Sequence, residues 1–139
     1  MTAKEFLMQG ILLDRQIDAK FEQIQQWRAL AEKRTANYTP SPGGGSPTPD
    51  RRMDIVAKIV DAERELDAEI DRLIDLKKDI SEVIARISHD RMRLLLELRY
   101  VNGHKWGEIA RMMHYSESNA KNLHSAALKK VSTLLDHEM

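Results

Sequence analysis

The stretch LLLELRYVNGHKWGEIARMMHYSESNAKNLHSAALKKV, residues 94–131, decides how the C-terminal part of the chain folds. Its apolar residues recur every three or four positions, which is the spacing of one helix face. Asn102-Gly103 stops the first helical pattern, because both residue types tolerate a positive φ. His114-Tyr115 marks a second turn. The stretch and its N-terminal extension therefore predict three short helices, over about 90–100, 106–113 and 117–135.

The second and third of these helices flank a tight turn, which is the arrangement of a helix-turn-helix. Ala110 is small enough for a close helix crossing, Ser116 is placed to cap the third helix, and Ala120 faces inward. The third helix then exposes side chains that suit base edges and phosphates, and its N-terminus adds a partial positive charge. We expect DNA contacts from Lys105, Ser116, Ser118, Asn119, Lys121, Asn122 and Ser125.

Two long helices are predicted before this region, on either side of a connector. All four prolines lie in TPSPGGGSPTP, residues 39–49, where no regular element is expected to continue. Apolar residues on both sides follow helical spacing, and two helices with a short connector fold back most simply as an antiparallel, coiled-coil-like hairpin. The expected apolar stripes are Phe6, Leu13, Ile17, Phe21, Ile24, Trp27 and Ala31, and then Ile55, Ile59, Ala62, Leu66, Ile70, Leu73, Ile80, Ile84 and Ile87.

The composition narrows the class of protein. The 139 residues include no cysteine, so disulfides and cysteine-based zinc sites are excluded. No apolar run has the length of a membrane span, and the N-terminus lacks a signal-peptide apolar block, so we expect a cytoplasmic protein. We predict an all-α fold with two domains, a hairpin arm at 1–89 and a helix-turn-helix domain at 90–139. The arm has net charge −2 and the C-terminal domain +2, which favours the latter as the place for an anionic partner.

Residues 94–131 resemble region 4 of sigma-70 family factors, and more closely the small region-4-like transcription regulators of phages and prophages of Gram-positive bacteria. The resemblance rests on Leu98-Arg99-Tyr100, Gly103, Trp106, Glu108-Ile109-Ala110, Tyr115-Ser116, His124 and Ala127-Leu128. It implies a DNA-binding protein that controls transcription, often of late phage genes. The third helix lacks the arginines of many such domains, and no segment resembles the sigma region that binds the −10 element.

Two other functions fit the same residues. Tri-helical domains also dock proteins, so the chain is alternatively an adaptor for RNA polymerase or another protein. A small-terminase-like DNA-packaging subunit is a third interpretation, although such subunits usually place the DNA-binding domain first. Trp106 is expected to pack at a helix start or to stack on a base, and His124 to bond locally or to contact a phosphate.

No enzyme activity, metal or cofactor is expected. The serines, histidines and carboxylates form no nucleophile–base pattern, and the chain has no glycine-rich phosphate loop. The five histidines are scattered along the sequence, without the spacing of a metal site.

A homodimer held by the N-terminal helices is expected. A single helix-turn-helix of net charge +2 has little electrostatic affinity for DNA, because each neutralised phosphate contributes a limited counterion-release term. The two apolar stripes also offer more surface than one hairpin can bury. Pairing two hairpins into a four-helix bundle would present two DNA-reading domains.

Overall fold

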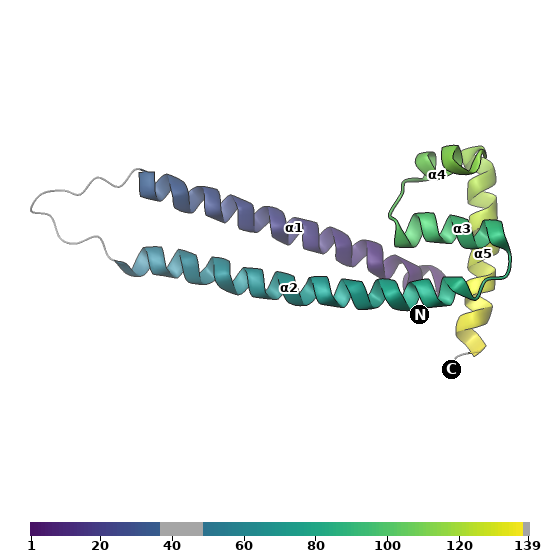
Figure 1. The fold of residues 1–139 in the computed structure, drawn as a ribbon, viewed down its shortest axis with the longest axis horizontal. Helices are drawn as coiled ribbons and strands as arrows, with labels where there is room; N and C mark the ends of the chain where they lie inside the picture. Colours follow the sequence, from purple (N-terminus) through teal and green to yellow (C-terminus); the bar gives the residue numbers. More distant parts are fainter. Residues whose placement is uncertain (37–48, 138–139) are drawn as a thin grey trace, which may run out of the picture. The chain divides into compact units, whose positions relative to one another are not determined.

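The computed structural model describes residues 1–36 and 49–137, and all regular structure within those ranges is helical. The all-α prediction is confirmed. The elements are α1 (Ala3–Ala36), α2 (Pro49–Ala85), α3 (Asp90–Leu96), the π-helical turn η1 (Glu97–Val101), α4 (Trp106–Met113) and α5 (Glu117–His137), as Figure 1 shows. The predicted connector lies outside the described residues except for Pro49, where α2 begins. Proline suits the first turn of a helix, because the backbone N–H groups of that turn have no partner within the helix and proline has no N–H to leave unpaired.

The chain divides into two compact units, and the division differs from the boundary expected at residue 89. The head unit comprises Met1–Asp14 and Arg72–Met139, and the arm unit comprises Arg15–Asp71. The start of α1 and the end of α2 therefore belong with the C-terminal helices. Ala3 and Leu7 of α1 and Ile80, Val83 and Ile84 of α2 lie in the same core as residues of the C-terminal helices.

Ion pairs in the arm unit define an antiparallel helix pair. Lys20 Nζ on α1 donates to Glu69 Oε1 on α2 at 2.7 Å and lies 3.8 Å from Glu65 Oε2. Further along α1, Arg28 pairs with Glu63, which is earlier on α2. As the residue number rises along α1, the partner's number falls along α2, so the two helices run in opposite directions.

The apolar stripe of the arm unit is narrower than the sequence suggested. Ile17, Ile24 and Leu66 are buried, as predicted. Phe21 and Ile70 were expected in the same stripe, but Phe21 is 54% exposed and Ile70 is 37% exposed. In a helix pair only the side chains at the centre of the contact are shielded. A residue at the edge of the stripe stays in solvent unless a third helix covers it.

One continuous hydrophobic core holds the head unit together. It joins residues from α1, α2 and all the later elements, and α3 and α4 both pack against α5 (Figure 1). Leu7 and Val83 are part of this core although neither was in a predicted stripe. The core contains Ala3, Leu7, Ile80, Val83, Ile84, Ile87, Leu95, Leu96, Leu98, Tyr100, Ile109, Ala110, Ala120, Ala127 and Val131.

The first C-terminal helix ends where the sequence predicts. Its last turn widens into η1, with the Asn102 N–H donating to the Glu97 carbonyl at 2.9 Å. Gly103 then takes a φ of +75°, which confirms it as the residue that stops the helix. Asn102 keeps a right-handed φ of −89°, so glycine alone supplies the positive φ.

Alanine substitutions at Gly10 and Gly103 should change the free energy of unfolding in opposite directions. A Cβ at the buried Gly10 would lie 3.5 Å from Ile80 Cδ1, an ordinary contact, so Gly10→Ala should raise the free energy of unfolding by about 0.5–1 kcal/mol. Gly103→Ala should lower it by about 1–2 kcal/mol, because its positive φ disfavours a Cβ. Urea unfolding of both variants measures the difference. Destabilisation by Gly10→Ala would show that α1 and α2 approach too closely there for a methyl group.

Candidate nucleic-acid interface

A tight turn sets the start of α5. His114 ends α4 in the left-handed region, with φ of 60°. The Tyr115 N–H then donates to the Ala110 carbonyl at 2.9 Å, which closes the turn. Ser116 Oγ accepts the Asn119 N–H at 3.1 Å, so the predicted turn and the predicted cap are both present.

Small residues let α4 and α5 pack closely. Ala110 on α4 and Ala120 on α5 are both buried in the head core. At Gly107 an added Cβ would lie 3.2 Å from Glu117 Oε1, the end of an exposed side chain that can move aside. The burial of Ala110 and Ala120 therefore leaves little room for larger side chains at those two positions.

All seven residues that the sequence assigned to DNA contact are exposed: Lys105, Ser116, Ser118, Asn119, Lys121, Asn122 and Ser125. They differ in their availability. Ser116 is used as the cap, and Ser125 Oγ donates to the Lys121 carbonyl at 3.2 Å. The side chains of Ser118, Asn119, Lys121 and Asn122 have no hydrogen bond or ion pair within the described part of the chain, which leaves their donors and acceptors free for a ligand.

Aromatic and basic side chains support α5 from the side of the core. His124 Nε2 lies 2.6 Å from the Tyr100 hydroxyl, and its ring meets the edge of Trp106 with centroids 4.6 Å apart. The Arg99 guanidinium lies 5.1 Å from the centroid of Trp106 and donates to the His104 carbonyl at 3.1 Å. Of the two roles considered for His124, local bonding is the one present. Trp106 packs at the start of α4.

Two arginines near this surface were not among the predicted contacts. Arg111 on α4 is exposed and lies in the last turn before the connection to α5. Arg91 on α3 bonds to the Tyr115 hydroxyl, with its guanidinium 5.5 Å from the centroid of that ring. Helical spacing places Arg111 on the polar side of α4, so that signal was available. The Arg91–Tyr115 contact joins residues 24 positions apart and leaves no mark in the local pattern.

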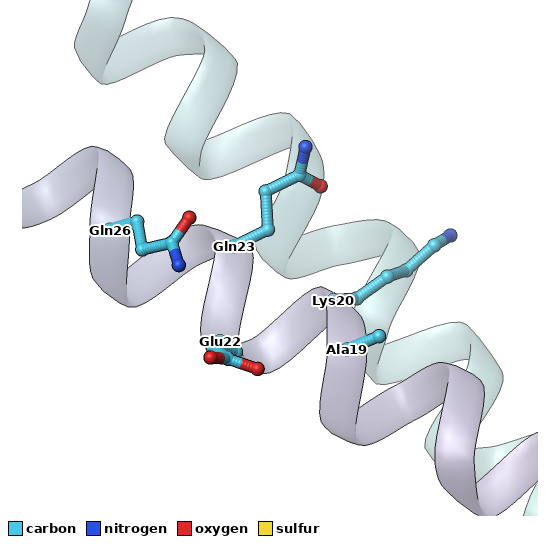
Figure 2. A pocket seen from close by; sticks show the side chains of 5 residues that line it. All are labelled: Ala19, Lys20, Glu22, Gln23 and Gln26. Atoms are coloured by element: carbon cyan, nitrogen blue, oxygen red, sulfur yellow. The ribbon is translucent and has the colours of Figure 1, made fainter.

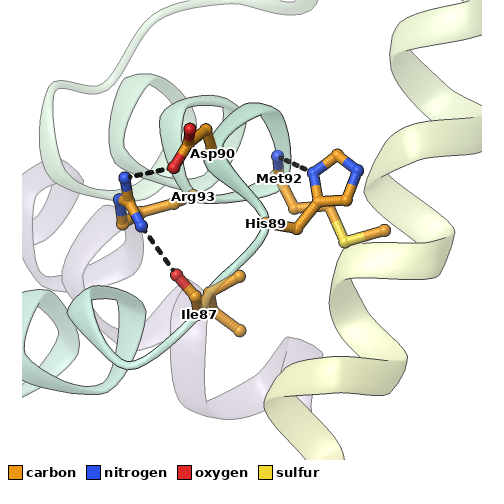
Figure 3. Close-up of polar contacts among 5 residues, drawn as sticks. All are labelled: Ile87, His89, Asp90, Met92 and Arg93. Carbon is orange, nitrogen blue, oxygen red and sulfur yellow. Dashed lines mark hydrogen bonds and ion pairs between the residues drawn. The ribbon is translucent and has the colours of Figure 1, made fainter.

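Polar contacts also fix the start of α3. His89 Nδ1 accepts the Met92 N–H at 3.3 Å, so His89 caps the helix (Figure 3). Arg93 donates to Asp90 Oδ1 and to the Ile87 carbonyl, each at 2.8 Å. These contacts tie the end of α2 to α3 and occupy the carboxylate of Asp90.

One surface hollow, of about 440 Å³, is lined by five side chains of α1 that fan out from a single helix (Figure 2). Across residues 1–36 and 49–137, no three His, Cys, Asp or Glu side chains gather in a way that would hold a metal ion. None of the helices in those ranges combines the length and the hydropathy that crossing a membrane requires.

Comparison with protein families adds one finding. Residues 13–133 match the family described as "Protein of unknown function (DUF722)". The chain belongs to this family. The DUF722 match spans α2 to α4 completely and most of α1 and α5, so it includes the turn and the exposed polar residues of α5. Comparisons with curated proteins and with solved structures found no match.

The DUF722 chain is expected to lose stability in acid through His124. Burial, and then the charges of Lys4 and Arg99, lower the pKa of His124 from 6.5 to about 4. The unfolded chain therefore binds one proton more than the folded chain between those values. The resulting stabilisation is complete above pH 6.5, falls as the pH falls, and levels off below about 4.

Between pH 7.0 and 4.5, the free energy of unfolding should fall by about 1–2 kcal/mol more for the wild type than for His124→Gln, which cannot titrate. This range is reduced from the full linkage value because part of the ring faces solvent. His104 lowers the pKa of Glu108 through a hydrogen bond, and that effect is common to both proteins. Equal losses of unfolding free energy in the two proteins, measured by urea unfolding, would show that His124 does not cause the acid destabilisation.

Proposed function

We propose that this DUF722 chain is a sequence-specific, double-stranded DNA-binding transcription regulator that reads the major groove with the first half of α5. The observation that carries the proposal is the set of exposed side chains at the capped start of that helix that have no partner among the described residues. Polar side chains without internal partners, on a helix end fixed by packing, are available for base edges without disturbing the fold.

Each of these residue types has a suitable contact in DNA. The amides of Asn119 and Asn122 can bond adenine N6 and N7 in two-point contacts, and Lys121 can bind phosphate. Lys105 and Arg111 add exposed positive charge at the two ends of α4, as expected for contacts to the sugar-phosphate backbone. The resemblance of residues 94–131 to region-4-like phage regulators supports the same function and suggests a phage-encoded, cytoplasmic regulator.

A second candidate is an adaptor that binds RNA polymerase or another protein through the same helices. The exposure of two large apolar side chains of the head unit favours it, since Met112 on α4 is 52% exposed and Leu94 on α3 is 45% exposed. Exposed apolar side chains are more useful at a protein interface than against DNA.

Selection from random duplexes separates the two functions. The full chain is incubated with a pool of random-sequence DNA at 0.15 M salt, bound duplexes are amplified over several rounds, and the enriched sequence is tested by gel shift. A DNA reader enriches a defined motif and binds it at least about 1,000-fold more tightly than scrambled DNA. No enrichment, together with binding to RNA polymerase, would favour the adaptor.

The regulator is further proposed to act as a homodimer through its N-terminal helices. Two DNA-reading heads on one duplex favour inverted half-sites about 34–36 Å apart, or a multiple of that distance. Sedimentation equilibrium of the full chain at tens of micromolar should give a mass near 32 kDa, twice the 16.0 kDa of one chain. A monomer at that concentration would contradict the proposed dimer and favour the RNA polymerase adaptor.

A further inference from the structure

A second row of side chains runs along α2 beside the stripe that faces α1, and it borders that stripe at Ile70 and at Glu63, which pairs with Arg28 of α1. The steps of this outer row are three, four, three, four and three residues, which keeps its members on one helix face. Four of the six positions are apolar and exposed, by 70% at Met53, 57% at Val56, 39% at Val60 and 37% at Ile70. The outer row consists of Met53, Val56, Val60, Glu63, Asp67 and Ile70.

This regularity distinguishes the outer row from ordinary surface apolar residues. Isolated exposed apolar residues are common and need no explanation. Met53, Val56 and Val60, at steps of three and four residues, follow the pattern by which helices pack on one another, and Glu63 and Asp67 separate them from Ile70. In contrast, Leu66 of the stripe that faces α1 is 7% exposed, whereas Met53 and Val56 are more than half exposed.

The surroundings of the outer row are strongly acidic. Residues 53–71 contain seven Asp or Glu and two Lys or Arg. Lys20 pairs with Glu65 and Glu69, and Arg28 pairs with Glu63. The remaining acids have no ion pair within the described part of the chain: Asp54, Asp61, Asp67 and Asp71.

We propose that the outer row binds an amphipathic helix of another protein, whose apolar side chains have three- and four-residue spacing and are flanked by Lys or Arg. Apolar side chains of the partner would pack against Met53, Val56 and Val60, and its flanking cations would meet the unpaired aspartates. The proposal concerns the arm unit alone and does not depend on DNA binding by α5.

The charges argue against other occupants. A second copy using the same row in a symmetric pair would bring one acidic surface against another, and like charges in contact are unfavourable. Nucleic acid and anionic membrane surfaces are repelled by the same carboxylates. The proposed homodimer therefore uses a different surface of the N-terminal helices.

A matched pair of peptides tests the proposal on the full chain. One is a fluorescein-labelled 21-residue helix with leucine at three- and four-residue steps and lysine at flanking positions. Its twin carries glutamate in place of lysine. Fluorescence anisotropy at 0.15 M salt should show binding of the lysine peptide at least about tenfold tighter than that of the glutamate peptide, with the preference shrinking as salt is added.

Variants then locate the contact. Val56→Ser/Val60→Ser should weaken binding of the lysine peptide about tenfold or more. Asp67→Asn/Asp71→Asn should weaken this binding less and make it less dependent on salt concentration. The control is Leu30→Ser, which removes a 59% exposed side chain from a separate hollow formed with Trp27, Ile55 and Lys58, and it should change affinity less than twofold. Circular dichroism confirms the helical content of each variant.

Three results would overturn the proposal. One is equal binding of the two peptides, and another is equal weakening by the Leu30 control. The third is a wild-type dimer in sedimentation that Val56→Ser/Val60→Ser converts to monomer, because a second copy would then cover the row.

Discussion

Asn119→Ala, Lys121→Ala and Asn122→Ala combined should weaken binding of the selected duplex at least about 100-fold at 0.15 M salt. Each two-point base contact contributes about 1–3 kcal/mol, and 1.4 kcal/mol is tenfold in affinity. Among the described residues, none of the three side chains has a hydrogen bond or ion pair to lose, so the melting temperature should not fall. Gel shifts with the same duplex measure the loss.

The matched control is Lys129→Ala, Lys130→Ala and Ser132→Ala, which alters three exposed residues of the same helix farther from its start. We expect this control to retain most of the sequence preference. Among the single variants, Lys121→Ala should weaken binding to all duplexes by the same factor. It should also reduce the slope of log affinity against log salt concentration by about one. The asparagine variants should instead reduce the preference for the selected sequence. Wild-type affinity in the first triple variant would show that α5 is not the reader.

Leu7→Ala should lower the free energy of unfolding by about 2–5 kcal/mol, the usual cost of a buried leucine. Leu7 is fully buried in the head core, although it lies near the N-terminus and far in sequence from α3 to α5. Leu12→Ala is the matched control, because Leu12 is on the same helix and 52% exposed. It should change stability by no more than about 0.5 kcal/mol.

A fragment of residues 90–139 tests whether the C-terminal helices need the core residues that α1 and α2 contribute. It lacks six members of the head core, namely Ala3, Leu7, Ile80, Val83, Ile84 and Ile87. We expect it to show no cooperative thermal transition by circular dichroism. Cooperative unfolding of the fragment, or small effects of both leucine variants, would show that the three C-terminal helices form a self-sufficient domain.

Local features of the structure could be predicted from the sequence because short-range physics sets them. Helical spacing predicted the helices. Gly103 predicted the end of the first short helix, and Ser116 predicted the cap of α5. The exposure of Asn119 and Lys121 followed from the same periodicity. Each of these depends on residues within about one helical turn of one another.

Features that depend on distant partners could not be predicted in this way. Leu7 did not fit the expected stripe of α1, and only the head core explains its burial. Phe21 fitted the stripe but has no third helix to cover it. The bond between His124 and Tyr100 joins two elements whose approach is set by tertiary packing, so the choice between local bonding and phosphate contact needed the structure.

The division of the head core between the two ends of the sequence has a consequence for folding during synthesis. Residues 15–71 contain both partners of each arm ion pair, so the arm helices can associate once that segment has left the ribosome. Ala3 and Leu7 must wait for Ala127 and Val131, whose translation comes more than 100 residues later. Closing so long a loop is entropically costly unless the arm has already formed and shortened it. An arm that forms first would thus bring the start of α1 close to the end of α2 before the residues of α5 are translated.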